Sequence, residues 1–269
     1  MEPSFDEILE DYKEFLEIYT QSSSSVLEKY YNDVVSIMAS DFEQSKFLNK
    51  LNDNLKIYNE VFISKNNFEL FEKIENIKIV KKPYDSMIEK CFRRDILEKG
   101  ALKTFLEHNY DELENKYIEH TPLNCYSKFE DIIRTRITTK YMDGALFFLE
   151  QLKKLINEFE LKSDEDYKAQ DDGYYALHLN VNYTFEIPDF KRNVIKFDSK
   201  VEIQINTSIQ NLLIELTHKY YTTGRHRLIK PDIEWQWKYD CDEFTPYYLG
   251  HITHYIEGAM VNIRNKVTL

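Results

Sequence analysis

Two segments in the second half of the chain alternate apolar and polar residues with a period of two. The first runs from 175 to 181 and the second from 201 to 205. This period predicts two β-strands, each with one face buried in a core. The other faces carry an aromatic ring, an imidazole, a carboxylate and amides, from Tyr174, His178, Asn180, Glu202, Gln204 and Asn206. A solvent-facing strand usually carries Lys, Thr and Glu, so we interpret these faces as the lining of a site.

Apolar residues at helical spacing dominate the first part of the chain and predict a helical N-terminal region over residues 1–73. Further strands are expected at 77–80, 129–139 and, as an edge strand, 233–239, with a hairpin excursion around 188–193. Further helices are expected at 84–94, after Asp143, after Ser208 and at about 247–264. The expected fold class is α+β, a mixed, mostly antiparallel β-sheet flanked by helices. We expect a sheet domain over 74–240 and a C-terminal helix, within 241–269, packed on that domain.

Composition narrows the class of protein. The 269 residues are 42% hydrophobic, which is enough to bury a core. No apolar run approaches the roughly 20 residues that span a bilayer, and the acidic start of the chain is unlike a signal peptide. The three cysteines are far apart, which fits a reducing cytosol and gives no metal-ligand spacing. A net charge of −12 opposes general adhesion to nucleic acid. We expect a cytoplasmic protein without a membrane or DNA partner.

Three groups of residues suggest chemistry. Asp131 and Glu202 lie in separate strands of the predicted sheet, and two such carboxylates suit a hard cation such as Mg²⁺ together with substrate phosphates. One helix face suits a polyphosphate, because it combines cations with a hydroxyl in Lys82, Ser86, Lys90 and Arg93. Tyr174 offers a stacking surface for a base. Each group also has a purely structural interpretation. The two carboxylates could form exposed ion pairs, the basic helix face could simply be solvated, and the tyrosine ring could pack on a neighbouring helix.

Four segments carry a resemblance to a known family, at 82–90, 129–137, 173–178 and 202–207. In this order they resemble the RelA/SpoT synthetase domain, a nucleotidyltransferase-like fold that moves pyrophosphate from ATP to a nucleotide 3′-hydroxyl. The resemblance implies a GTP diphosphokinase-like pyrophosphotransferase with ATP as donor and Mg²⁺ as cofactor. It assigns ATP binding to Lys82, Ser86, Lys90, Arg93 and Arg136, with Arg136 stacked on adenine. It assigns catalysis and metal binding to Asp131 and Glu202, and acceptor binding to Tyr174, His178, Gln204, Asn211 and His218.

The chain departs from the family pattern at several positions. Arg134 stands where the family usually has Gly, Asn206 where it has Arg, and Val80 where it has Arg. The loop after Gly173 and the C-terminal tail look most like the toxic small alarmone synthetases of toxin–antitoxin pairs. That likeness implies a favoured acceptor, the 3′-terminal adenosine at the CCA end of tRNA, with inhibition of translation and a neutralising antitoxin. An acceptor that brings no 5′-diphosphate is one account of the arginine lost at Asn206.

Other readings stay open on the sequence. A small alarmone synthetase would make (p)ppGpp from GDP or GTP, or (p)ppApp from adenine nucleotides. An inactive RelA/SpoT fold would serve as a binding module, and an unrelated helical adaptor would leave the polar strand faces unexplained. A tRNA acceptor would need basic contacts outside the cleft, for which the candidates are Lys191, Arg192, Arg225, Arg227 and Lys230.

Overall fold

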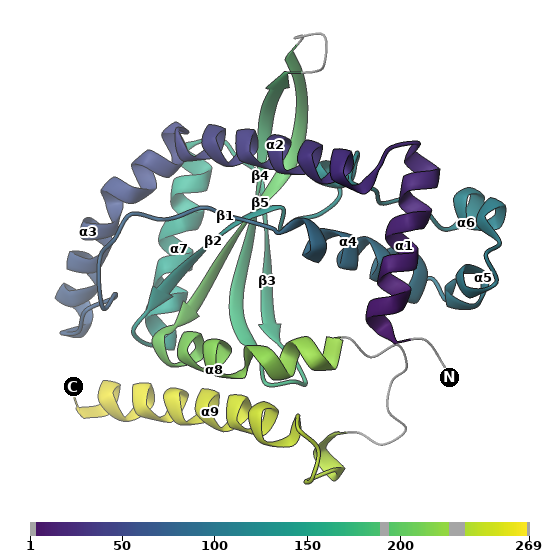
Figure 1. Ribbon diagram of the computed structural model, residues 1–269. Coiled ribbons are helices and arrows are strands. Elements are labelled where there is room, and N and C mark those ends of the chain that lie inside the picture. The colour runs from purple at the N-terminus through teal and green to yellow at the C-terminus, as the bar shows by residue number, and fades with distance from the viewer. Residues whose placement is uncertain (1–3, 189–193, 226–234, 268–269) are drawn as a thin grey trace.

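The computed structural model describes residues 4–188, 194–225 and 235–267, with residues 188 and 218–225 as backbone only. Its strands form one five-stranded sheet in the order β1-β2-β5-β4-β3 (Figure 1). Their bounds are β1 Val80–Lys81, β2 Ile133–Thr139, β3 Ser163–Ala169, β4 Tyr175–Pro188 and β5 Val194–Thr207. Strands β2 and β5 are parallel, and the other neighbouring pairs are antiparallel. The expected mixed, mostly antiparallel sheet flanked by helices is therefore confirmed.

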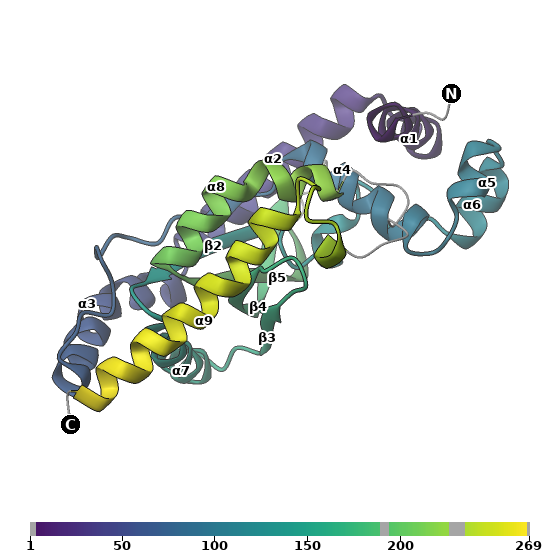
Figure 2. The same ribbon diagram turned by 90° about the horizontal axis from the view of Figure 1, so that it is seen from below.

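Helices surround this sheet. Those before β2 are α1 Phe5–Thr20, α2 Ser24–Glu43, α3 Lys46–Asn66, α4 Tyr84–Phe92, the π-helix η1 Arg93–Leu97, α5 Leu102–Leu106, α6 Tyr110–Lys116 and the 3-10 helix η2 Cys125–Ser127. Those after it are α7 Met142–Glu158, α8 Ser208–Arg225, the 3-10 helix η3 Trp235–Trp237 and α9 Phe244–Val267. Figure 2 shows α8 and α9 next to each other on one side of the molecule. No helix in the described part of the chain is both long and apolar enough to cross a membrane.

The two faces of the sheet differ in chemistry, as the period of two predicts. The apolar face contains Ile133, Leu179, Val201 and Ile203, all fully buried, and it packs against α2 and α7. The opposite face carries two polar rows that cross the sheet from strand to strand. In the register of the strands these rows are Arg134–Glu202–Asn180–Asp164 and Arg136–Gln204–His178–Asp166. Side chains from four strands thus meet on one face.

The N-terminal helices share the core of the sheet. Helix α1 starts with a capping box between Ser4 and Glu7, which satisfies free backbone N–H groups at the helix start. The ring of Tyr12 packs edge-on against Phe92 of α4 at 5.3 Å between centroids, and Phe15 packs against Phe105 at 6.4 Å. These rings and the buried sheet residues belong to one hydrophobic cluster. The helical extension expected at the N-terminus therefore helps to hold α4 in place.

Several strands differ from those expected. The strand expected at 77–80 is limited to β1, Val80–Lys81, and the one expected over 129–139 begins only at Ile133. The alternation of Trp235, Trp237 and Tyr239 predicted an edge strand, but residues 235–237 form the 3-10 helix η3. Trp235 stacks on His251 of α9 at 6.1 Å, while Trp237 is 84% exposed. The two tryptophans therefore alternate between a buried and an exposed side because a single helical turn packs on α9 through Trp235. The structure also contains β3, which the sequence did not predict. Because β3 is almost wholly solvent-exposed, it has no apolar alternation to reveal it.

Helix α9 braces the loop that leads into β4. Gly173 has φ +79°, and a Cβ at Gly173 or Gly250 would collide with the backbone of the other segment. The contact therefore needs glycine on both sides. His251 Nδ1 lies 2.8 Å from the hydroxyl of Tyr175, and His254 stacks on the same ring at 3.7 Å. The loop that carries Tyr174 is thus fixed by α9.

A buried carboxyl on α9 should make stability depend on pH. Glu257 is 3% exposed and accepts a hydrogen bond from Thr207 Oγ1 at 2.9 Å. Burial raises the pKa of Glu257 to about 7, so in this range the unfolded chain loses the proton first. The free energy of unfolding should then fall as pH rises, by about 3 kcal/mol between pH 4 and pH 8. Glu257→Gln should remove that fall in urea titrations, and parallel pH profiles for the two proteins would contradict the assignment.

Candidate active site

Two lysines hold the carboxylate of Asp131 at the end of the sheet. Lys82 follows β1, Lys90 lies on α4, and Asp131 lies two residues before β2. The Nζ atom of Lys82 is 2.8 Å from one carboxylate oxygen, and that of Lys90 is 2.7 Å from the other. The carbonyl of Lys82 accepts a hydrogen bond from Tyr31 of α2 at 2.9 Å, and Lys90 lies 4.8 Å from the centre of the Phe129 ring. The cluster is therefore fixed from several elements.

The charges of this cluster depend on one another. Burial opposes ionisation of Asp131, but Lys82 and Lys90 outweigh it and hold the pKa of Asp131 well below its usual range. Burial also lowers the pKa of Lys82, while the ion pair with Asp131 opposes that shift. A phosphate group that entered here could replace the carboxylate as the partner of both cations.

A cavity of about 420 Å³ opens beside the cluster. Its lining includes all four residues of the predicted basic helix face, Lys82, Ser86, Lys90 and Arg93, together with Asp131. Arg93 donates from Nε to Glu89 at 2.8 Å, and its Nη2 is buried without a hydrogen-bond partner among the described residues. A cavity with several cations and a free N–H donor is suited to bind a polyphosphate.

Arg134 adds a cation that the sequence analysis noted only as a departure from the family. It lines the same cavity, and its positive charge acts to lower the pKa values of both Lys82 and Tyr174. Within the described ranges, its guanidinium forms no ion pair or hydrogen bond with another side chain. The sequence contained a signal for this role, because the alternation along β2 puts Arg134 on the same face as Arg136.

Glu202 is held at the centre of the polar face. His178 Nδ1 lies 2.9 Å from Oε1 of Glu202, and Gln204 donates to Oε2 at 2.6 Å. Burial opposes ionisation of this carboxyl, but the contacts with His178 and Gln204 lower its pKa below the usual value. Nε2 of His178 lies 3.0 Å from the hydroxyl of Tyr174. With Nδ1 protonated, the imidazole donates to Glu202 and accepts from Tyr174.

Tyr174 is partly buried between the loop and this face. Burial raises the pKa of its hydroxyl to about 12, with the charge of Arg136 acting in the opposite direction. Asn206, which stands in place of a family arginine, is fully buried, and its side-chain amide has no hydrogen-bond partner among the described residues. Position 206 therefore lies inside the fold and does not present its amide to the open cavity.

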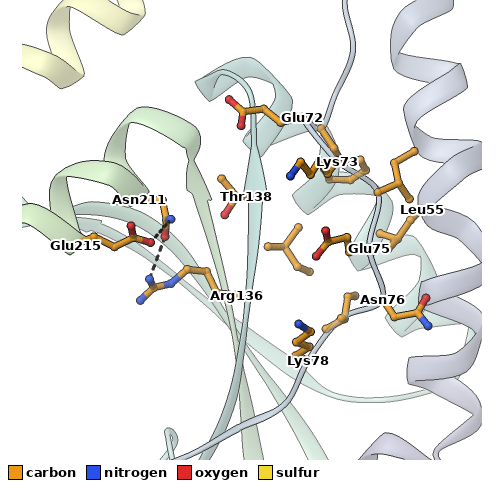
Figure 3. Close-up of a pocket in the computed structure, with 14 residues that line it drawn as sticks. Leu55, Glu72, Lys73, Glu75, Asn76, Lys78, Arg136, Thr138, Asn211 and Glu215 are labelled. Atoms are coloured by element: carbon orange, nitrogen blue, oxygen red, sulfur yellow. Dashed lines mark hydrogen bonds between the residues drawn. The ribbon is translucent and has the colours of Figure 1, made fainter.

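Arg136 lines a second and larger cavity, of about 670 Å³, between the edge of β2 and residues 71–78 (Figure 3). Its Nη1 donates to Asn211 of α8 at 3.0 Å, and Nε and Nη2 approach Gln204 at 3.4 and 3.3 Å. Asn211 in turn donates to Glu215 at 2.9 Å. A planar guanidinium fixed by amides beside an open cavity is suited to stack on a nucleobase.

The structure brings most of the predicted site residues to one region. The phosphate-side cavity and the Glu202 group meet at Arg134, and the opposing effect of Asp131 on the pKa of Glu202 shows that the two carboxylates lie within electrostatic reach. Of His218 and Arg225 the structure describes the backbone alone, within α8. The other four predicted tRNA contacts lie outside the described residues, namely Lys191, Arg192, Arg227 and Lys230.

The donor set fits one mode of Mg²⁺ binding. No cluster of three or more His, Cys, Asp or Glu side chains suited to a metal occurs within the described residues. Mg²⁺ in nucleotide sites is commonly held by one or two carboxylates, with phosphates and water completing its shell. Asp131 and Glu202 fit that mode, because Asp131 lines the phosphate-sized cavity and Glu202 lies next to Arg134 of that cavity in the register of β2 and β5.

Comparison with known proteins gives matches at the level of structure. No family model matches the sequence, and no curated protein matches it. The structure is similar to small alarmone synthetase 1 from Bacillus subtilis bound to its product pppGpp, at 16% identity and a TM-score of 0.49, covering 82% of this chain and 93% of that chain. It is also similar to small alarmone synthetase 2 from the same organism, at 18% identity and a TM-score of 0.48, covering 82% and 94%. A GTP pyrophosphokinase family protein from Streptococcus pneumoniae has 19% identity and a TM-score of 0.47, covering 82% and 88%.

These structural neighbours are small alarmone synthetases and a GTP pyrophosphokinase family protein. They are the kind of protein that the four sequence segments resemble. At these sequence identities and TM-scores the comparison does not establish the activity of this chain, so the activity has to be inferred from the geometry of its own site.

Proposed function

We propose that this protein transfers the β,γ-pyrophosphate of ATP to the 3′-hydroxyl of a nucleoside di- or triphosphate, as an alarmone synthetase does. One observation carries the proposal: the Lys82–Asp131–Lys90 cluster lines a cavity together with the cation Arg134, and Arg134 stands beside Glu202, the partner of His178, in the register of β2 and β5. Phosphoryl-type transfer depends mainly on positioning and on neutralising charge. The site supplies cations for the phosphates and a carboxylate for the attacking hydroxyl.

Each residue has a defined part in this reaction. The acceptor hydroxyl forms a bond to the β-phosphorus, the bond between that phosphorus and the oxygen bridging to the α-phosphate breaks, and AMP leaves. Lys82, Lys90 and Arg93 bind the phosphates of ATP, and Arg136 stacks on the adenine in the larger cavity. Glu202 accepts the hydrogen bond of the attacking hydroxyl and receives its proton, while His178 and Gln204 hold its two oxygens. Mg²⁺, bound by Asp131 and Glu202, would neutralise charge on the transferred phosphates.

Arg134 favours a nucleotide acceptor over tRNA. The likeness of the loop after Gly173 and of the C-terminal tail implied tRNA, and the arginine missing at position 206, which would leave acceptor 5′-phosphates without a cation, agreed with it. In the structure Asn206 is buried, whereas Arg134 offers an unpaired guanidinium on the same polar face. A nucleoside di- or triphosphate therefore has a cation for its 5′-phosphates. Tyr174, next to Glu202 and His178, is placed to contact the acceptor base.

The decisive experiment offers ATP labelled in the γ-phosphate together with GDP, GTP, AMP, ADP or deacylated tRNA. We expect label in a guanine or adenine nucleoside polyphosphate, with AMP formed in equal amount. Release of ADP instead of AMP would contradict pyrophosphate transfer. Label in tRNA alone would establish the toxin-like alternative, in which translation is inhibited and an antitoxin is the expected partner.

A pair of variants tests the role of Arg134. Arg134→Met should raise KM for a 5′-diphosphate acceptor by about 10- to 100-fold, since a hydrogen bond to a charged group contributes about 1.5–3 kcal/mol. Arg134 also lines the cavity proposed for the ATP phosphates, so the KM for ATP should rise as well, but by less, because Lys82, Lys90 and Arg93 remain. Lys200→Met is the matched control, because Lys200 is two residues from Glu202 but already pairs with Glu130 and Asp164 at 2.7 and 2.9 Å. Equal effects of the two substitutions would contradict this role.

A further inference from the structure

An aromatic ring lies beside one of the two lysines that hold Asp131. The ammonium nitrogen of Lys90 is 4.8 Å from the centre of the Phe129 ring, within the roughly 6 Å over which a ring face attracts a cation. Phe129 is 3% exposed, and the side chain of Lys90 is 24% exposed. Such contacts are stronger where water is largely excluded. The ring therefore contributes to the position of Lys90 in the cavity.

The ring and Asp131 interact with this lysine in different ways. Asp131 accepts one of the three N–H donors of the ammonium group of Lys90, at 2.7 Å. The face of a phenyl ring attracts the positive charge without a strong acceptor atom. When a phosphate replaces Asp131 as the partner of Lys90, the contact with Phe129 can persist and the N–H donors stay available to the phosphate.

A histidine stacks on the same ring. The imidazole of His120 lies nearly parallel to the Phe129 ring, with 4.9 Å between the centroids and 10° between the planes. Its Nδ1 is 2.7 Å from Oδ1 of Asp95, and because a carboxylate only accepts hydrogen bonds, Nδ1 is the donor. The backbone N–H of His120 donates to Oδ2 of Asp95 at 2.8 Å. One carboxylate thus fixes both the ring and the backbone of the histidine.

Asp95 lies on the continuous helix that carries two of the cavity's cations. It is fully buried in the π-helix η1, which begins with Arg93 directly after α4. Single π-helical turns within α-helices are frequent at functional sites. The contacts run from Asp95 through His120 and Phe129 to Lys90, and so return to the same helix. They tie the segment that leads to Asp131 against the helix that carries the cations.

We propose that Phe129 positions the ammonium group of Lys90 for the phosphates of ATP, and that His120, fixed by Asp95, holds the Phe129 ring in place. This inference rests on the proposed function, which assigns Lys90 to ATP. Neither ring lines the cavity proposed for the phosphates, so Phe129 and His120 are positioning residues that act through Lys90. A ring that only filled the hydrophobic core would affect folding, but its electron density would not affect ATP.

Fluorination of the ring tests the contact with the cation. Phenylalanine with one, two or three ring fluorines at position 129 has less electron density on the ring face and nearly the same size. The dissociation constant for ATP with Mg²⁺, measured by calorimetry without acceptor, should rise stepwise, by about 2- to 30-fold in total. Phe147 is the matched control, since Lys65 lies 6.0 Å from its ring centre and neither residue lines the phosphate cavity. An unchanged dissociation constant across the series at position 129 would overturn the proposal.

A double-mutant cycle tests whether the ring acts through Lys90. Phe129→Leu should weaken ATP binding in the wild-type background. In a Lys90→Met background the same substitution should have little further effect, because the ammonium group that the ring positions is already absent. Equal weakening in both backgrounds would show general damage to the site and would overturn the proposal.

Two substitutions test the histidine. His120→Phe keeps a flat ring against Phe129 and should retain the affinity for ATP, whereas His120→Ala removes the ring and should weaken binding. His108→Ala is the control, because His108 also stacks on an aromatic ring, that of Tyr110 at 5.7 Å, and it should bind ATP as the wild type does. Equal loss of affinity in both His120 variants would overturn the role of His120.

The binding measurement separates this inference from the proposed function. A wild-type protein that binds no ATP would overturn both. A protein that binds ATP with an affinity independent of the ring at position 129 would overturn the inference alone. A protein that binds ATP, responds to fluorination and forms no AMP with any acceptor would support the inference and contradict the proposed function.

Discussion

Replacing Glu202 with glutamine should lower kcat for pyrophosphate transfer by about 10²- to 10⁴-fold, the range found for loss of a general base. Glutamine has the same shape, but it cannot accept the proton of the attacking hydroxyl. Its remaining oxygen can still accept one of the two hydrogen bonds that His178 and Gln204 donate to Glu202. The KM for ATP should change little, and the rate of AMP formation at saturating ATP and acceptor measures the effect.

Asp166→Asn is the matched control for this experiment. Asp166 lies on the same sheet face, across from His178 in the register of β3 and β4, and it pairs with Lys168 at the sheet edge. Because it faces neither cavity, its neutralisation should leave kcat within about threefold of wild type, as for most exposed changes. A fully active Glu202→Gln variant would refute the catalytic assignment.

Lys82→Met should lower kcat/KM for ATP by about 10²- to 10³-fold, comparable to the loss of one donor that stabilises developing charge. Lys82 is buried beside the cavity, and methionine retains most of its apolar stem without the ammonium group. The fold should persist, because Asp131 keeps its ion pair with Lys90. Steady-state kinetics at varied ATP, with the thermal midpoint as a check on folding, measures the effect.

The neighbouring Lys81 provides the control. It does not line the cavity and donates to Ser36 of α2 at 3.2 Å, so Lys81→Met removes the same charge from the adjacent position of the chain. Its kcat/KM should stay close to the wild-type value. If the two variants lost activity equally, a general charge effect would explain the data, and the proposed phosphate contact of Lys82 would be wrong.

The strand pattern and the polar face could be read from the sequence because both follow from local alternation. Apolar residues at every second position must share the buried face, so Glu202, Gln204 and His178 had to share the other. Their contacts could not be read in this way. The 2.9 Å approach of His178 to Glu202 depends on how β4 and β5 are aligned, and that alignment is set across the hairpin by the fold as a whole.

There is also a physical reason why the sequence analysis missed one segment and misassigned another. Strand β3 follows no apolar period because almost all of its residues face solvent. Trp235 and Trp237 have the spacing of a strand, but Trp235 packs on α9 and Trp237 points to solvent. The position of Arg134 at the junction of the two groups also depends on the fold, since it requires β1, α4 and β5 to meet around the start of β2.

The first helix bears directly on how shortened versions of this protein should be interpreted. The guanidinium carbon of Arg93 lies 5.3 Å from the centre of the Phe5 ring, and Phe5 packs edge-on against Phe92 at 5.9 Å. A deletion of the first twenty residues would remove the ring beside Arg93, a cation that lines the proposed phosphate cavity, and uncover the aromatic core around Phe92. An inactive truncation of that kind would report damage to the scaffold and would give no ground for calling the segment regulatory. Affinity tags are for the same reason better placed at the other end of the chain.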